Sequence, residues 1–143
     1  MISDGPVFID ANILVYFRNV NDLRKQVIAQ NWIRQLADSH LGRISTQVLV
    51  EFYAVAARSE KQLLSSQQAQ ADIEAFSTWQ PIQPSIELFR CAWDLTDKYS
   101  LSWWDAMIVA AALISGCRTL LSEDMQDGLV INNTLTIVNP FAL

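Results

Sequence analysis

The stretch Val7-Phe8-Ile9-Asp10-Ala11-Asn12 passes from three apolar, β-prone residues to an acid and then to an apolar run at residues 13–17. This order predicts a short strand that leads into a helix, with Asn12 as the helix N-cap. Further short strands are predicted around Ile44, at Ile82 and at residues 119–122, and a last one is predicted at residues 135–138. Each follows a stretch that has helical character.

Apolar residues recur at helical spacing in five longer stretches. The predicted helices cover residues 22–39, 46–58, 66–79, 85–99 and 103–115. Asp22, Thr46, Ser85 and Ser102 are expected to cap their first turns, and Gly116 is placed to end the last helix. Strands that alternate with helices in this way predict an α/β fold with a parallel sheet covered on both faces.

Length and composition predict one domain that spans residues 1–143. With 143 residues, 51% of them hydrophobic, the chain can bury a substantial core without disulfides. Cys91 and Cys117 lack the spacing of a zinc site or redox pair, and no apolar run is long enough to cross a membrane, so we expect a cytoplasmic protein. The net charge of −5 argues against broad electrostatic attraction to nucleic acid.

Four acids occupy related positions along this chain. Asp10 and Asp124 lie at or just past predicted strand ends, whereas Glu51 and Asp105 lie in the first two turns of predicted helices. Parallel α/β sheets bring the carboxyl ends of their strands to one edge, so these acids can meet in one crevice. Taken singly, each acid also fits a turn or a helix cap. Their joint placement favours a functional site.

Four carboxylates in one crevice repel one another unless a cation is present. An all-oxygen ligand set is typical of Mg²⁺ or Mn²⁺. One or two such ions can activate water and stabilise the attacking and leaving oxygens during phosphodiester hydrolysis. The only histidine, His40, is predicted in a loop away from the acids, which argues against a histidine-dependent hydrolase.

The chain resembles the PIN-domain nucleases in four segments that follow the family's order. These segments are Phe8-Ile9-Asp10-Ala11-Asn12-Ile13-Leu14-Val15-Tyr16, Ser45-Thr46-Gln47-Val48-Leu49-Val50-Glu51-Phe52, Ser102-Trp103-Trp104-Asp105-Ala106-Met107-Ile108-Val109-Ala110-Ala111 and Leu121-Ser122-Glu123-Asp124. The resemblance covers nearly the whole chain. Its small single-domain size is similar to that of the VapC-type toxins of bacterial toxin–antitoxin pairs.

This resemblance implies a three-layer α/β/α sandwich with a central, mostly parallel sheet and a Mg²⁺- or Mn²⁺-dependent endoribonuclease activity. It assigns metal binding and catalysis to an acidic quartet formed by Asp10, Glu51, Asp105 and Asp124. It makes Asn12 and Ser122 supporting residues that orient the ligands, and Asp127 is a further candidate ligand. The partners that it implies are an RNA substrate, a cognate antitoxin and a second copy of the chain in a homodimer.

The residues that flank these motifs have more than one interpretation. Arg18, Arg24 and Lys25 are candidates to hold RNA phosphates, although long cations near helix ends are commonly solvated. Trp103 and Trp104, next to Asp105, are candidates for base stacking, for antitoxin binding or for core packing.

Two other functions are compatible with the same pattern. One is a non-catalytic PIN-fold interaction module that binds a partner through its aromatic surface and need not be stabilised by Mg²⁺. The other is a phosphatase in which Asp10 is the nucleophile and a phosphoaspartate forms.

Overall fold

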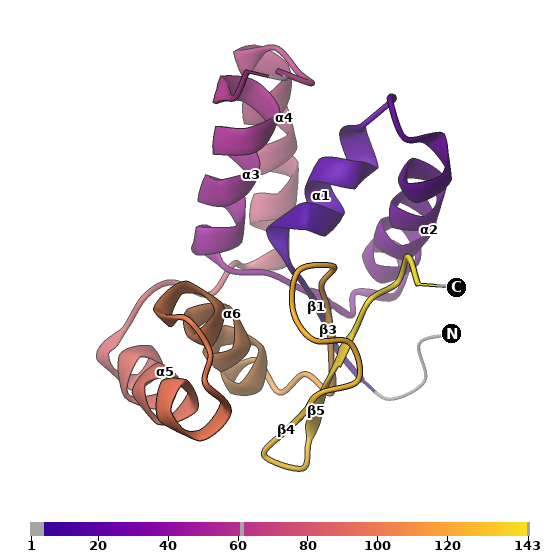
Figure 1. The fold of residues 1–143 in the computed structure, drawn as a ribbon. Coiled ribbons are helices and arrows are strands. Elements are labelled where there is room, and N and C mark those ends of the chain that lie inside the picture. The colour runs from indigo at the N-terminus through magenta and orange to yellow at the C-terminus, as the bar shows by residue number, and fades with distance from the viewer. Residues whose placement is uncertain (1–4, 61, 143) are drawn as a thin grey trace.

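A central sheet organises the chain (Figure 1). The computed structural model describes residues 5–60 and 62–142. Its strands are β1 (Val7–Ile9), β2 (Gly42–Arg43), β3 (Thr119–Leu121), β4 (Val130–Ile131) and β5 (Leu135–Val138). They form one 5-stranded sheet in the order β2-β1-β3-β5-β4. All neighbouring pairs are parallel except β4 and β5, which are antiparallel, so the predicted mostly parallel sheet is confirmed.

The helices are α1 (Ala11–Arg18), α2 (Leu23–Ser39), α3 (Thr46–Arg58), α4 (Ser66–Phe76), α5 (Ile86–Tyr99) and α6 (Trp103–Ile114), with a 3₁₀ turn at Ser77–Trp79. In Figure 1, α5 and α6 lie on one side of the strands and α2 lies on the other, which gives the expected three-layer α/β/α arrangement. Among the described residues, no helix is both long and apolar enough to cross a membrane.

The core lies between the sheet and the helices that cover it. Phe8, Ile9, Leu120 and Leu121 are fully buried, as expected for short parallel strands covered on both faces. Residues 106–112 of α6 are buried on all sides, in agreement with the apolar character of that helix. The rigid strands therefore end at fixed points, and the residues that follow them are held in fixed positions.

Two predicted helix caps are wrong by one or two positions. Asp10, not Asn12, caps α1, because its carboxylate accepts the Ala11 N–H at 2.7 Å. Ser45, not Thr46, caps α3, because its hydroxyl accepts the Val48 N–H at 3.3 Å. Asn12 is therefore within a helix, where its amide is free to make other bonds. The predicted caps that are confirmed are Asp22, Ser85 and Ser102.

The smallest strands differ most from the sequence-based expectation. The strand expected around Ile44 ends at Arg43, and Ile82 forms only an isolated bridge with Ser45. The antiparallel strand β4 was not predicted. Its hairpin turn contains Asn132 and Asn133 at φ values of 50° and 60°, a left-handed conformation that asparagine tolerates, so this Asn-Asn pair was the available signal.

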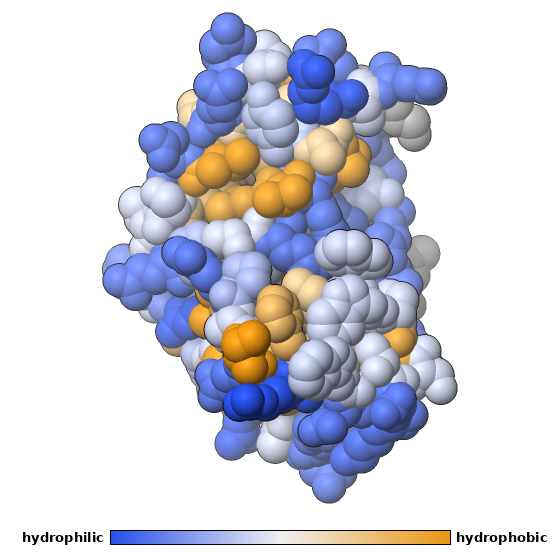
Figure 2. Space-filling view, turned by 90° about the vertical axis from the view of Figure 1, so that its left-hand side faces the viewer, coloured by the Kyte–Doolittle hydropathy of each residue, from blue (hydrophilic) through white to orange (hydrophobic). Residues whose placement is uncertain are grey.

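Exposed apolar side chains are spread over the face that α3 to α6 present. Figure 2 shows this face, with hydrophobic residues among polar ones. The exposed apolar residues of these helices include Val50 and Val55 on α3, Ile86 and Trp93 on α5, and Trp104 on α6.

Candidate active site

The four predicted acids line one cavity with a volume of about 630 Å³. Asp10 follows β1 and Asp124 lies three residues after β3, so the parallel pairing of these strands brings both to the same edge of the sheet. Glu51 reaches the cavity from the second turn of α3 and Asp105 from the first turn of α6. Among the described residues that line this cavity there is no lysine or arginine.

Asp10 is the most strongly held of these acids. It is only 7% exposed. Its Oδ1 accepts the Ala11 N–H at 2.7 Å, and its Oδ2 accepts the Ser122 hydroxyl at 2.9 Å. The carboxylate is thus fixed by its own helix N-terminus on one side and by the end of β3 on the other.

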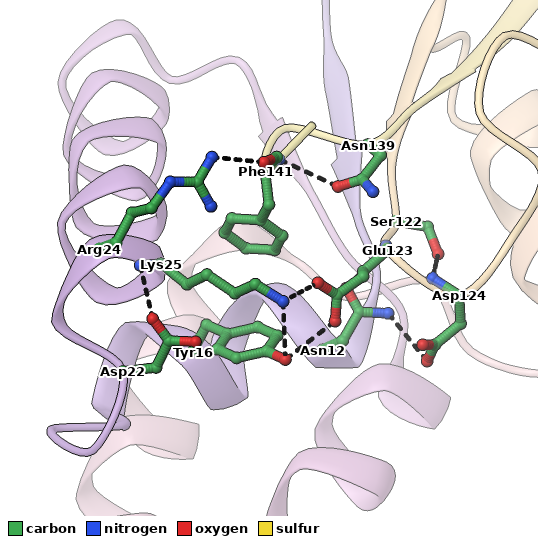
Figure 3. Close-up of polar contacts among 10 residues, drawn as sticks. All are labelled: Asn12, Tyr16, Asp22, Arg24, Lys25, Ser122, Glu123, Asp124, Asn139 and Phe141. Atoms are coloured by element: carbon green, nitrogen blue, oxygen red, sulfur yellow. Dashed lines mark hydrogen bonds and ion pairs between the residues drawn. The ribbon is translucent and has the colours of Figure 1, made fainter. Parts of the chain in front are cut away.

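Asn12 and Ser122 connect Asp10 to Asp124 through hydrogen bonds. Asn12 Nδ2 donates to Asp124 Oδ2 at 3.2 Å and to Asp10 Oδ2 at 3.4 Å. The fully buried Ser122 hydroxyl also accepts the Asp124 N–H at 3.3 Å (Figure 3). Both residues therefore contact two acids, and neither side chain carries a charge.

The carboxyl groups affect one another electrostatically. The pKa of Asp10 is raised from 3.8 to about 6, mainly by burial. The charges of Glu51 and Asp105 contribute to this rise, and the hydrogen bonds from Ala11 and Ser122 oppose it. Burial also raises the pKa of Glu51 and of Asp105, and the charge of Asp124 adds to both shifts. The site thus favours either bound protons or a bound cation.

The donor set fits a hard divalent cation that keeps part of its water shell. Four carboxylates that form no ion pair among the described residues suit Mg²⁺ or Mn²⁺. Within residues 5–60 and 62–142, no three such side chains already stand in an arrangement that ligates an ion directly. Mg²⁺ is commonly held by only one or two protein carboxylates together with water and substrate oxygens, so this spacing is compatible with it.

The structure does not bring Asp127 to this cavity. Asp127 Oδ1 accepts the Asn139 N–H at 2.9 Å, which anchors the chain after β5. His40 is also distant in the fold: it ends α2 in a left-handed conformation and lines a second cavity, of about 630 Å³, whose described lining contains no carboxylate. The aspartate therefore has a structural partner, and the histidine lies outside the acidic site.

The two tryptophans next to Asp105 have different surroundings. Trp103 is half-buried and packs on Phe89 with ring centroids 6.1 Å apart. Trp104 is 66% exposed, and its backbone carbonyl accepts a hydrogen bond from Gln47. Core packing accounts for Trp103, whereas the Trp104 ring faces solvent.

The three cations after the first motif all have partners within the chain. Arg18 pairs with Asp72 at 2.6 Å, Arg24 donates to the Phe141 carbonyl at 2.6 Å, and Lys25 pairs with Glu123. Sequence reasoning did not identify Tyr16 and Glu123 as cavity residues. Their signal was indirect, since Glu123 adjoins Asp124 and Tyr16 lies one helical turn after Asn12.

The family is decided by a sequence comparison. The sequence profile of the PIN domain matches residues 7–126, which include all four acids. The chain belongs to the PIN-domain family. No curated protein sequence is significantly similar to this PIN domain.

Solved structures with the same fold include toxin–antitoxin proteins. VapBC2 from Rickettsia felis, bound to a DNA fragment from its promoter, is 21% identical with a TM-score of 0.66, and the match covers 92% of this chain and 96% of that one. A toxin–antitoxin complex from Klebsiella pneumoniae is 22% identical with a TM-score of 0.66, covering 96% and 99%. The toxin VapC20 from Mycobacterium tuberculosis, described as cleaving the sarcin–ricin loop, is 20% identical with a TM-score of 0.62, covering 82% and 91%.

Proposed function

We propose that this PIN domain is a Mg²⁺- or Mn²⁺-dependent endoribonuclease that acts as a VapC-like toxin and is inhibited by a cognate antitoxin. The observation that carries this proposal is the convergence of four carboxylates from four separate elements on one cavity. The structural neighbours add support, since they are toxin–antitoxin proteins and one of them is described as cleaving the sarcin–ricin loop.

In this proposal the four acids do not all bind the ion in the same way. Asp10, Asp105 and Asp124 hold the ion, and Glu51 completes the site directly or through water. When bound, the ion supplies Lewis acidity that activates water and stabilises charge on the phosphodiester. Asn12 and Ser122 keep Asp10 and Asp124 in place by hydrogen bonds. We leave Asp127 out of this set, because it does not line the cavity and its Oδ1 accepts the Asn139 N–H.

The surroundings of Asp10 favour metal-assisted hydrolysis over an aspartyl-nucleophile mechanism. Both of its oxygens accept hydrogen bonds, from Ala11 and Ser122, and the side chain is almost fully buried. A carboxylate held in this way is suited to a fixed ligand position. A phosphatase would instead accumulate a phosphoaspartate at Asp10, and mass spectrometry of protein incubated with a phosphate ester distinguishes the two.

The partners in this proposal are an RNA substrate, an antitoxin and a second copy of the chain, in the cytoplasm. The exposed apolar residues on α3 and α6, among them Val50, Val55 and Trp104, offer area that a protein partner can cover. The absence of lysine and arginine from the described cavity lining means that a bound cation is required before an RNA phosphate can approach the acids closely.

The decisive experiment is an RNA cleavage assay with the purified chain. We expect cleavage in Mg²⁺ or Mn²⁺, loss of cleavage in EDTA, and recovery when the metal is added in excess. Asp10→Asn and Asp105→Asn are expected to be inactive under all three conditions. Cleavage that does not depend on metal would contradict the proposal. Absence of cleavage of any RNA in either metal would also contradict it and would favour a non-catalytic interaction module.

A further inference from the structure

Glu123 is a fifth acid on the cavity wall, and its carboxylate is occupied by other partners. The Tyr16 hydroxyl donates to Glu123 Oε1 at 2.9 Å, and the Lys25 ammonium pairs with Oε2. Lys25 also donates to the Tyr16 hydroxyl at 3.3 Å. Figure 3 shows the three side chains meeting from α1, α2 and the turn after β3. Both oxygens of Glu123 are therefore engaged, one of them by the Lys25 ammonium, whereas none of the four acids beside it forms an ion pair among the described residues.

The Lys25 ammonium is held in a defined position. It lies 4.7 Å from the centroid of the Tyr16 ring and 5.4 Å from that of Phe141, so two aromatic rings surround it. Arg24, its neighbour on α2, fixes the Phe141 segment through a 2.6 Å hydrogen bond to the Phe141 carbonyl. The lysine side chain is 24% exposed, and its pairing with Glu123 thus joins α2 to the turn that carries Asp124.

The same turn orients the amide of Asn12. The Glu123 N–H donates to Asn12 Oδ1 at 3.1 Å. This bond leaves the Nδ2 group to donate to Asp124 Oδ2 at 3.2 Å (Figure 3). The position of Glu123 therefore decides which end of the Asn12 amide faces Asp124. A chain of contacts runs from Lys25 through Glu123 and Asn12 to the Asp124 carboxylate.

We propose that Lys25 is a positioning residue that acts through Glu123 and Asn12 to hold Asp124 where a divalent cation needs it. The inference rests on the metal site of the proposed function. Lys25 does not touch the ion or the substrate. It fixes the turn at residues 122–124 against α2 and neutralises the one cavity acid whose side chain is directed to Tyr16 rather than to the ion site.

Two physical effects of removing the Lys25 charge have opposite signs, which makes the proposal testable. If the lysine acts only as a nearby positive charge, its loss leaves Glu123 unpaired and strengthens the attraction of the site for a dication. If the lysine positions the turn, its loss weakens metal binding, because residues that orient metal ligands typically contribute about 10-fold or more to affinity.

The experiment measures Mn²⁺ affinity by isothermal titration calorimetry with the metal alone and the intact chain. Lys25→Met keeps most of the stem and removes the charge, and we expect it to bind Mn²⁺ about 10-fold more weakly. Lys25→Arg keeps a charged donor, so its Mn²⁺ affinity is expected to be close to that of wild type. The matched control is Arg18→Met, which breaks a comparable ion pair with Asp72 away from the cavity and is expected to stay within about 2-fold of wild type.

Tyr16→Phe provides a second, uncharged variant in case Lys25→Met does not fold. It removes one donor to Glu123 without changing the net charge, and we expect a loss of about 3-fold in Mn²⁺ affinity. Unchanged or tighter Mn²⁺ binding by the folded Lys25→Met variant, or unchanged binding by Tyr16→Phe, would overturn the positioning role and leave the proposed function intact. Failure of the wild-type chain to bind Mn²⁺ would overturn both.

Discussion

The Ser122 hydroxyl donates a hydrogen bond of 2.9 Å to Asp10 Oδ2, and so joins the ends of two neighbouring parallel strands. Ser122 is fully buried and Asp10 nearly so, hence the bond is shielded from water. It explains how a carboxylate is kept at the base of a polar cavity, although burial and neighbouring charges oppose its ionisation.

Asp10→Asn tests the central acid. We expect RNA cleavage to fall by more than about 100-fold, because a ligand to the ion is lost. In EDTA the Tm should stay the same or rise, since the substitution removes a buried charge that Glu51 and Asp105 repel. The measurements are a cleavage rate in Mg²⁺ and a thermal melt. Asp127→Asn is the control and should cleave RNA within about 2-fold of wild type, because Asp127 lies outside the cavity.

The metal-free chain should gain stability as the pH falls. The pKa of Asp10 is raised from 3.8 to about 6, so the folded state binds more protons than the unfolded chain between these values. Its contribution is therefore fully present below about pH 4 and is lost as the pH rises through about 6. For Asp10 alone the difference corresponds to at most about 3 kcal/mol. Urea unfolding in EDTA at pH 5 and pH 7.5 measures about half of this difference, since the rest appears only between about pH 5 and pH 4. Asp10→Asn should show a smaller dependence.

Mn²⁺ should stabilise the folded chain. A metal that binds only the folded state adds about 2.7 kcal/mol at a concentration 100 times its Kd, which raises the Tm by roughly 5–10 °C for a chain of this size. Thermal melts across a Mn²⁺ titration measure the effect. Asp124→Asn should remove most of the shift while Asp127→Asn retains it. A wild-type chain that melts at the same temperature with and without the metal would instead fit an interaction module.

Gly42→Ala should destabilise the fold without altering the site. A Cβ at this buried position in β2 would overlap Cζ3 of Trp79, whose ring packs edge-on against Phe76. Displacing that ring is expected to lower the free energy of unfolding by about 1–3 kcal/mol. Urea unfolding measures the loss, and Trp79→Phe in the same chain should recover part of it. Equal stability of Gly42→Ala and wild type would show that the ring moves freely.

Local patterns in the sequence were enough to predict most of the architecture. Helical periodicity and serine or aspartate caps depend on residues within a few positions of one another, so α2, α5 and α6 were placed closely. The strand-to-helix order predicted a parallel sheet, and that topology in turn predicted that Asp10 and Asp124 would lie at one edge. Very short strands such as β4 could not be predicted, because a pattern of alternating residues cannot be recognised in two residues.

Periodicity and strand order along the chain therefore predict the α/β class and the acids that meet at one edge of the sheet. How those acids are held depends instead on contacts between residues that lie far apart in the sequence. The bond between Ser122 and Asp10 joins residues 112 positions apart, and the pair Lys25 and Glu123 joins residues 98 apart. The structure also shows that Asp127, three residues after Asp124, accepts a hydrogen bond from Asn139 and does not line the cavity. Such pairings depend on how helices and turns pack against the sheet, and no local pattern encodes that packing.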